Sequence, residues 1–226
     1  MSKRIIKTDS EIQAKKDQIK TGIKTKFDNN QVSIADGNSK LGKTPNFNLS
    51  PVKSCPNCTD CKKDCYALKY YNQYVNTEIA YDSNLLIAKY KPNVLKQSII
   101  DFLSKKRRNS ITKFRIHGSG DMFSQSYFEL WIDIAKLYPR ITFFMFTKNY
   151  NLDFSNIPDN MIIRYSVFYN SDNIPESIKS LPKAYTITDV KITEKNNGYI
   201  CPCDCRNCNF CSDINSKMLD VYFPLH

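Results

Sequence analysis

The nine cysteines of this 226-residue chain fall in two short segments and occur nowhere else. The first segment carries four and the second carries five: Cys55, Cys58, Cys61 and Cys65, then Cys201, Cys203, Cys205, Cys208 and Cys211. Thiolates this closely spaced are metal ligands before anything else, and one compact loop can carry all the ligands of one centre. The sequence therefore predicts two cysteine-rich metal loops.

The spacing of the first segment favours iron–sulfur chemistry. Its order, Cys-x2-Cys-x2-Cys-x3-Cys, is that of bacterial ferredoxin-type [4Fe–4S] sites, without the proline that usually follows the fourth cysteine. Zinc usually takes two short cysteine pairs separated by about a dozen residues, so that two stretches of chain approach one small ion. A four-iron cluster is wider, and one loop can wrap it corner by corner. We predict two [4Fe–4S] clusters, with zinc as the alternative metal.

The second segment holds one thiol more than the four that a single cluster needs. Within it, Cys201-x3-Cys205-x2-Cys208 also matches the three-cysteine spacing of radical S-adenosylmethionine enzymes, whose cluster leaves one iron open for that cofactor. Several spacings fit by chance in so dense a segment. S-adenosylmethionine is nevertheless a candidate cofactor.

Disulfide bonds are the third interpretation of the cysteines, and they require an oxidising compartment and usually an even number of thiols. The N-terminus, Met1 to Lys7, is charged and is followed by no apolar signal segment. The longest apolar run, Ile141 to Phe146, is far shorter than the roughly 20 residues of a membrane helix. We expect a cytoplasmic protein with reduced thiols and no membrane segment.

The chain is strongly basic, with a net charge of +11. Such a charge favours polyanionic partners, which are nucleic acids, nucleotides or phosphorylated substrates. Lysines spread over solvated faces would give the same total, and the run Lys105 to Arg108 would also suit a helix C-terminus. The length suits one domain that needs no metal to fold.

Strand-like and helix-like patterns alternate along most of the chain. Residues 1–30 are predicted as a basic helical extension, with the helix at 8–23, and residues 31–226 as a single α/β iron–sulfur domain. Short extended pieces are expected at 31–34 and 46–49, strands at 114–117, 141–146, 162–168, 183–188 and 220–224, and helices at 66–90, 93–106, 126–138 and 175–180. This alternation predicts an α/β fold with a mostly parallel sheet or an incomplete (β/α) barrel.

Polar residues cluster where the first long strand ends. Parallel α/β folds place their chemistry at the carboxyl ends of the strands, and glycines there allow close backbone approach. The predicted catalytic residues are Arg115, His117, Ser119, Asp121 and Lys148, and the predicted cofactor-binding residues are Lys43, Asn46, Gly118, Gly120 and Thr147. The alternative is a glycine-rich turn with a buried His117 and with Asp121 as a cap.

Two further patterns are interpreted conservatively. Residues 37–44 match G-x4-G-K-T, but prolines at Pro45 and Pro51 exclude the helix that a phosphate-binding loop must open into, although Lys40 and Lys43 can still touch phosphate. The run Tyr66, Tyr70, Tyr71 and Tyr74 is expected to pack in the core rather than to stack on bases.

Five motifs distribute over the chain from residue 38 onward. They are Asn38-Ser39-Lys40-Leu41-Gly42-Lys43-Thr44-Pro45-Asn46-Phe47-Asn48-Leu49, Cys61-x3-Cys65-Tyr66-Ala67, Arg115-Ile116-His117-x-Ser119-Gly120-Asp121-x-Phe123-Ser124, Phe146-Thr147-Lys148 and Cys201-Pro202-x-Asp204-Cys205-x2-Cys208-x2-Cys211. With these motifs the chain resembles the phage gene-product-88 family. More distantly it is similar to phage proteins grouped with radical S-adenosylmethionine enzymes, although its first loop lacks their usual Cys-x3-Cys-x2-Cys order.

The resemblance implies a ligand set and an arrangement. It implies that Cys201, Cys205, Cys208 and Cys211 hold the second cluster and that Cys203 is the extra thiol. It also implies a partial barrel, with one cluster in the N-terminal loop and an auxiliary cluster near the C-terminus.

Two functions are expected from different classes. The first is an iron–sulfur protein with two [4Fe–4S]-type clusters, acting as a redox or radical S-adenosylmethionine-like enzyme on a nucleic acid or nucleotide. The alternative is a non-enzymatic, zinc- or cluster-stabilised nucleic-acid-binding protein of a phage or mobile element. The sequence does not choose between an enzyme and a binding protein, and it leaves the oligomeric state open.

Overall fold

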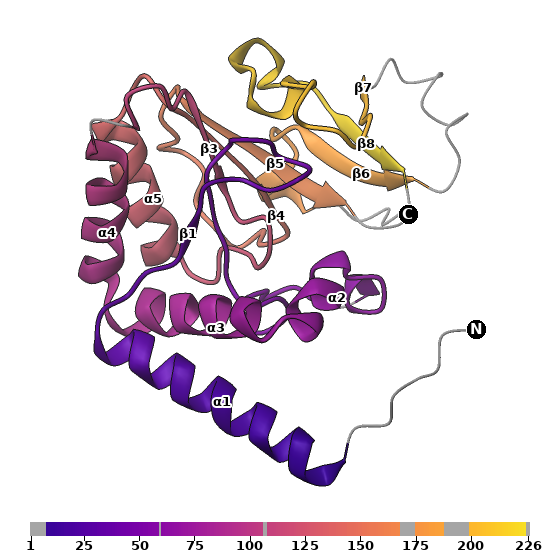
Figure 1. Cartoon of the computed structure of the whole chain (residues 1–226). Helices are drawn as coiled ribbons and strands as arrows, with labels where there is room; N and C mark the ends of the chain where they lie inside the picture. The colour runs from indigo at the N-terminus through magenta and orange to yellow at the C-terminus, as the bar shows by residue number, and fades with distance from the viewer. Residues whose placement is uncertain (1–7, 59, 106–107, 168–174, 188–198, 225–226) are drawn as a thin grey trace.

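The computed structural model describes residues 8–58, 60–105, 108–167, 175–187 and 199–224. In these ranges the chain forms an α/β fold with one eight-stranded, mostly parallel sheet and five α-helices (Figure 1). The mostly parallel α/β sheet predicted from the sequence is therefore confirmed. Several predicted features fall outside the described residues: Met1 to Lys7, Lys106 and Arg107 of the basic run, and the strand ends at Phe168 and Thr188.

The strands follow one another across the sheet almost in sequence order. They are β1 (Ile34–Ala35), β2 (Asn46–Phe47), β3 (Lys113–Ile116), β4 (Thr142–Thr147), β5 (Met161–Val167), β6 (Lys183–Ile187), β7 (Tyr199–Ile200) and β8 (Val221–Pro224), in the order β1-β2-β3-β4-β5-β6-β8-β7. All neighbours are parallel except β1 and β2. Among the described residues no ladder joins β1 to β7, so the sheet has two edges. Right-handed crossovers between strands in this order return on the same face.

The helices gather on one side of the sheet. They are α1 (Asp9–Asp28), α2 (Tyr66–Gln73), α3 (Val75–Tyr90), α4 (Pro92–Ser104) and α5 (Gln125–Leu137), and the short 3-10 helices are Asp60–Lys62, Glu176–Ile178, Phe210–Ser212 and Ile214–Ser216. The expected long helix at 66–90 is two helices, because Tyr74 has extended backbone angles that end α2 and begin α3. No helix of the described part is long and apolar enough to cross a bilayer.

Helix α1 is longer than the predicted helix at 8–23. A capping box between Thr8 and Glu11 starts it, and none of its described residues is buried. It packs along α3, where Gly22 lies so close to Ile79 that an added Cβ would come within 2.6 Å of Cδ1. The helix thus lies on the outside of the helical layer (Figure 1).

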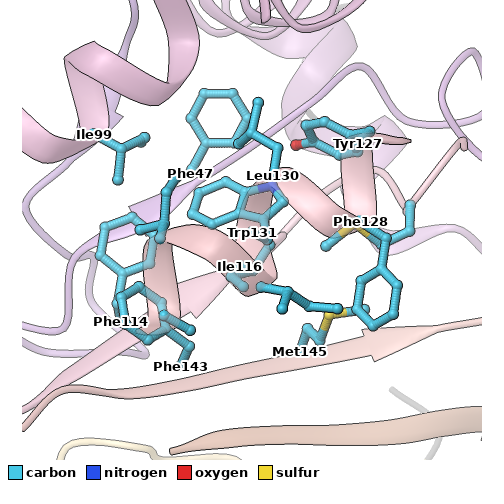
Figure 2. Packing of buried hydrophobic residues seen from close by; sticks show 14 of the residues in the cluster. Phe47, Ile99, Phe114, Ile116, Tyr127, Phe128, Leu130, Trp131, Phe143 and Met145 are labelled. Atoms are coloured by element: carbon cyan, nitrogen blue, oxygen red, sulfur yellow. The ribbon is translucent and has the colours of Figure 1, made fainter. Parts of the chain in front are cut away.

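The main core lies between the sheet and helices α3, α4 and α5. In β3, Phe114 and Ile116 face these helices, while Lys113 and Arg115 point to the other face, as the period-two alternation requires. Trp131 of α5 is fully buried, with ring centroids 5.6 Å from Phe47 and 5.8 Å from Phe114. Figure 2 shows Trp131 among the labelled aromatic side chains.

The C-terminal part of the chain covers the opposite face of the sheet. A second, smaller core forms there from Ala184, Cys201 and Val221, with Phe146 and Phe210 packed against it. The cysteines from Cys201 to Cys211 therefore lie on the sheet face opposite the described α-helices.

Truncating Phe114 should destabilise the fold by about 3–5 kcal/mol, because Phe114→Ala removes a buried ring and leaves a cavity beside Trp131. Guanidinium unfolding measures this loss. Leu137→Ala, at the exposed end of α5, is the matched control and should change stability by about 0.5 kcal/mol or less. Equal effects of the two substitutions would contradict the assigned core.

Candidate functional site

A buried carboxylate joins the loops that follow β3 and β4. Asp121 is 5% exposed, and its oxygens accept hydrogen bonds from the Thr147 hydroxyl (2.6 Å), the Lys148 amide (2.8 Å) and the Met122 amide (2.7 Å). Burial raises the pKa of Asp121 to about 6, although these hydrogen bonds oppose the shift. The structure thus brings three predicted site residues, Asp121, Thr147 and Lys148, into contact.

Asn48, which follows β2, ties the same region to the start of the parallel sheet. Its Oδ1 accepts the amides of Gly118 (2.7 Å) and Ser119 (3.1 Å), and its Nδ2 donates to Asn46 Oδ1 (2.5 Å). The Ser119 hydroxyl donates to Leu49 O at 3.0 Å. The strand-end analysis missed Asn48, although it lies within one of the family-like motifs.

The two glycines of this loop are required by the close packing of the protein itself. A Cβ on Gly118 would lie 2.9 Å from Asn48 Oδ1, and one on Gly120 would lie 2.5 Å from Ser54 Oγ. Gly120 also has a φ of +86°, a conformation that L side chains rarely adopt. Packing against Asn48 and Ser54 accounts for the glycines that the sequence assigned to cofactor binding.

His117 lies inside the core rather than on the surface of the site. It is 3% exposed, its φ is 62°, and its Nε2 is 2.9 Å from the hydroxyl of Tyr127. Its Nδ1 is buried and has no hydrogen-bond partner among the described residues. Burial, followed by the charge of Arg115, lowers the pKa of His117 to about 3, so the ring is neutral. This arrangement matches the alternative of a buried histidine in a glycine-rich turn.

The first cysteine segment, Cys55 to Cys65, lies beside these strand ends. Asn57 Nδ2 donates to Lys148 O at 2.7 Å, and the Tyr66 hydroxyl donates to Gly118 O. Burial and then the charge of Asp121 raise the pKa of Cys55 to about 12. Cys58 Sγ and Cys61 Sγ are 3.8 Å apart. The segment therefore lies at the carboxyl edge of the parallel strands, next to the predicted site residues.

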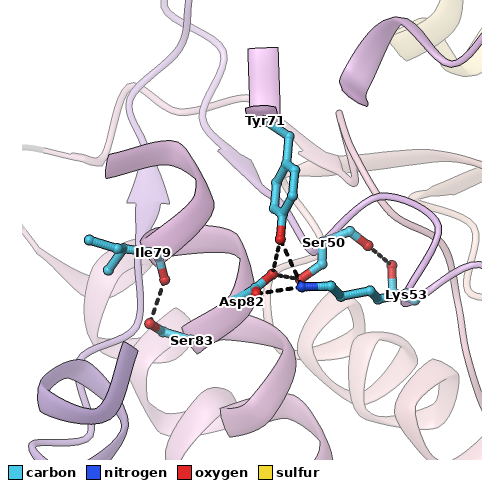
Figure 3. Close-up of polar contacts among 7 residues, drawn as sticks. Ser50, Lys53, Tyr71, Ile79, Asp82 and Ser83 are labelled. Carbon is cyan, nitrogen blue, oxygen red and sulfur yellow. Dashed lines mark hydrogen bonds and ion pairs between the residues drawn. The ribbon is translucent and has the colours of Figure 1, made fainter. Parts of the chain in front are cut away.

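A polar cluster supports the turn that leads into this segment (Figure 3). Asp82 of α3 accepts hydrogen bonds from the hydroxyls of Ser50 and Tyr71 and from Lys53 Nζ, which also lies 2.9 Å from Tyr71 Oη. Burial lowers the pKa of Lys53, but its bonds to Asp82 and Tyr71 outweigh this and raise it overall. Between Ser50 and Lys53 in the chain, Val52 has a φ of 66°, a strained value for a β-branched residue. These contacts fix the position of the turn after which the first cysteine segment starts at Cys55.

The second cysteine segment, Cys201 to Cys211, is bordered by cations. Burial raises the pKa of both Cys201 and Cys211 to about 11. The charge of Lys40 opposes this shift at Cys201, and the charges of Arg164 and Arg115 oppose it at Cys211. The backbone joins in, because the Cys205 amide donates to Lys40 O at 3.1 Å. Arg115 thus faces the second segment, while its Nε donates to His117 O at 3.3 Å.

Arg164 of β5 holds the end of this segment against the sheet by hydrogen bonds. It is 1% exposed, and its guanidinium donates to the carbonyls of Leu219 (3.0 Å), Cys211 (3.1 Å) and Ser216 (2.6 Å). These partners are neutral, and burial lowers the pKa of Arg164, although the charges of Cys211 and Asp220 oppose the shift. A buried cation of this kind favours negative charge on the neighbouring thiol.

The loop at residues 37–44 forms a turn closed by a bridge between Asn38 and Gly42 and leads into strand β2. It therefore does not open into a helix, which confirms that it is not a phosphate-binding loop of the P-loop type. Gly42 packs against Arg206, and Lys43 is exposed. The loop borders the second cysteine segment.

The donor set of both segments consists of thiols. All nine cysteines lie in the described part of the chain, and none of them forms a disulfide bond there, so this structure does not support the disulfide interpretation. Among the described residues, no group of three or more His, Cys, Asp or Glu side chains is arranged to hold a metal ion. Thiols in these numbers suit zinc and iron–sulfur clusters alike.

The comparisons with known proteins place the chain in a family. A family model described as Gene product 88 matches residues 12–218. The chain belongs to the gene product 88 family. No curated protein and no solved structure matches it. The family resemblance drawn from the motifs is confirmed, whereas the distant likeness to radical S-adenosylmethionine enzymes receives no support from the comparisons.

Acid should destabilise the protein partly through His117. Its pKa is about 3 in the folded state and about 6.5 when unfolded, so the unfolded chain takes up the proton first as the pH falls. Stability is thus lost as the pH drops below about 6.5, and the His117 contribution between pH 7 and pH 5 is about 2 kcal/mol. His117→Gln removes the titration, so the difference in unfolding free energy between variant and wild type should change by that amount. An unchanged difference would show that His117 is not buried neutral.

Proposed function

We propose that the protein is an iron–sulfur enzyme with two [4Fe–4S]-type clusters. The first would be held by Cys55, Cys58, Cys61 and Cys65, and the second by Cys201, Cys205, Cys208 and Cys211, with Cys203 as the extra thiol. One observation carries the proposal: the first cysteine segment lies at the carboxyl edge of the parallel sheet, joined to the loops after β3 and β4 through Lys148 and Gly118. Parallel α/β folds bind their substrates and cofactors at this edge.

The charges around the second segment support an anionic centre there. Arg164 is buried with neutral hydrogen-bond partners, and Arg115 and Lys40 act on the thiols of Cys211 and Cys201. Thiolate ligands would place negative charge where these three cations converge. This is the arrangement expected of an auxiliary cluster buried on the sheet face.

The residues of the strand ends then divide by role. Asp121, Ser119 and His117 are buried and position the loops, while Lys148 is partly exposed. Burial raises the pKa of Cys58 to about 11, and the charge of Lys148 opposes this shift. Lys148 would therefore meet a substrate beside the first cluster, and Lys43, exposed on the loop at 37–44, could contact a phosphate. With the chain's net charge of +11, these cations favour a nucleic acid or nucleotide as substrate and a cytoplasmic setting in which the thiols stay reduced.

The strand order is the one that a partial barrel would need. Strands β2 to β6 and then β8 stand side by side in sequence order, and the first cysteine segment follows β2, the first of the parallel strands. This likeness to the partial barrel that the distant resemblance to radical S-adenosylmethionine enzymes implies supports S-adenosylmethionine as the cofactor to test. A reduced cluster supplies single electrons, and the chain's own residues would bind and orient the substrate.

A second function is favoured by one distance. Tetrahedral zinc with Zn–S bonds of about 2.3 Å separates its sulfur ligands by about 3.8 Å. The observed 3.8 Å between Cys58 Sγ and Cys61 Sγ matches this edge. It supports, for this pair, the alternative of a zinc-stabilised nucleic-acid-binding protein.

Metal analysis of anaerobically purified protein separates the two functions. We expect about eight irons and eight sulfides per chain, from two four-iron clusters. Cys205→Ser should lose about half of both, because it removes a ligand of the second cluster, whereas Cys203→Ser, two residues away, should lose neither. A colourless protein with stoichiometric zinc would contradict the iron–sulfur proposal and favour the binding protein.

Addition of S-adenosylmethionine should change the electron paramagnetic resonance spectrum of the dithionite-reduced protein if one of the four thiols does not ligate, because the cofactor would then coordinate the iron of the first cluster that this thiol leaves open. Methylthioadenosine, which lacks the amino and carboxylate groups that would bind the iron, is the control ligand. Spectra that stay identical at saturating S-adenosylmethionine, in protein with full iron content, would limit the function to cluster-based redox chemistry without that cofactor.

A further inference from the structure

Three tyrosines form an exposed stripe along α2. Tyr66, Tyr70 and Tyr74 are 64%, 56% and 51% exposed and follow one another at intervals of four residues. Residues four apart lie on the same helix face, which places Tyr66 and Tyr70 together, and Tyr74 follows them as the extended residue at which α2 ends. We call these three residues the tyrosine stripe. Its exposure corrects the expectation that this aromatic run packs in the core, which holds only for Tyr71.

The stripe is held facing outward by the opposite side of the helix. Tyr71 is buried and donates its hydroxyl hydrogen bond to Asp82 of α3 at 2.7 Å, and Ala67 is buried beside it. This contact fixes the rotation of α2, so the three tyrosines cannot turn inward without breaking it. Isolated exposed aromatic residues are ordinary, but three that follow one another along a helix and at its end mark a surface for binding.

The surroundings of the stripe are basic. Lys62 and Lys63 precede the helix, and Lys69 lies on it, all exposed. Helix α2 contains no acidic residue, although Asp64 lies just before it. Aromatic rings combined with lysines are the composition of surfaces that bind single-stranded nucleic acid, where bases stack and phosphates are neutralised.

We propose that the tyrosine stripe binds single-stranded nucleic acid by stacking with its bases and leads the strand to the first cysteine segment. The inference rests on the proposed function, because it takes the nucleic-acid substrate proposed there and specifies it as a single strand. The direction follows from Tyr66, which succeeds Cys65 and whose hydroxyl donates to Gly118 O of the strand-end loop. A strand lying along α2 therefore ends beside Lys148 and the first cysteine segment.

The spacing suits bases better than a flat partner. Tyr66 and Tyr70 are separated by about 6 Å along the helix axis, which is nearly twice the rise of about 3.4 Å between stacked bases. A base can then lie between two rings. A duplex keeps its bases paired and stacked inside, so it would offer the tyrosines only its backbone.

The test is fluorescence anisotropy with a labelled oligothymidylate of about 12 nucleotides, a length within the usual site size of such surfaces. Tyr70→Ala and Tyr74→Ala should each weaken binding about tenfold, since each removes one stacking ring. The variants should retain the salt dependence of the wild type, because a tyrosine neutralises no phosphate. Lys62→Gln with Lys63→Gln should instead reduce the slope of affinity against salt. A duplex of the same length should bind more weakly than the single strand.

Tyr90→Ala is the matched control. Tyr90 is 70% exposed but lies at the far end of α3, about 24 Å along that helix from its start. Equal affinities of the Tyr70, Tyr74 and Tyr90 variants, or no binding of the oligonucleotide at about 50 mM salt, would overturn the proposal. A change of oligomeric state in the Tyr70 and Tyr74 variants, with unchanged oligonucleotide affinity, would assign the stripe to a second copy of the chain and overturn it as well.

Iron and sulfide measured on the same preparations separate this inference from the proposed function. Binding through the stripe in protein without clusters would leave the nucleic-acid surface standing and remove the enzyme. Full clusters without oligonucleotide binding would leave the iron–sulfur proposal standing and remove the nucleic-acid surface.

Discussion

The site depends on the buried carboxylate of Asp121. A carboxylate taken out of water is costly unless donors surround it, and Asp121 gathers the Thr147 hydroxyl and the amides of Lys148 and Met122. Its own amide donates to Ser54 Oγ at 3.2 Å, one residue before Cys55. One residue thereby joins the ends of β3 and β4 to the turn that begins the first cysteine segment. The position of that segment at the sheet edge follows from this set of hydrogen bonds.

A second buried charge serves the other face of the sheet. Arg164 rises from β5 and holds the carbonyls of Cys211, Ser216 and Leu219, so the second cysteine segment cannot leave the sheet without exposing those carbonyls and stranding the guanidinium. The two cysteine segments consequently lie in different electrostatic surroundings. The first segment has one anion and one cation close to it, because the charge of Asp121 acts on Cys55 and that of Lys148 acts on Cys58. In the second segment, the charges of two cations, Arg164 and Arg115, act on Cys211.

Local patterns in the sequence predict the parallel sheet well, because each of its long strands carries its own signal. Phe114 and Ile116 alternate with polar residues, and the run from Ile141 to Phe146 is apolar on both faces. The break at Tyr74, the exposure of the tyrosine stripe and the role of Asn48 could not be predicted in this way. Asn48 and Gly118 meet across 70 residues of chain, and the rotation of α2 depends on Asp82 in the next helix. Such contacts exist only once the tertiary fold has formed.

The loop at residues 37–44 shows why a motif has to be judged with its structural context. Its glycines satisfy the G-x4-G-K-T expression, yet Gly37 has a φ of +129° and Gly42 one of +61°, and both serve a tight turn. An added Cβ on Gly37 would lie 1.8 Å from Gly42 O, so the turn itself demands glycine. Lys40 then offers its carbonyl to Cys205 and its charge to Cys201. The same residues that suggest a nucleotide site thus shape the border of the second cysteine segment, and phosphate could meet them through the exposed side chains of Lys40 and Lys43.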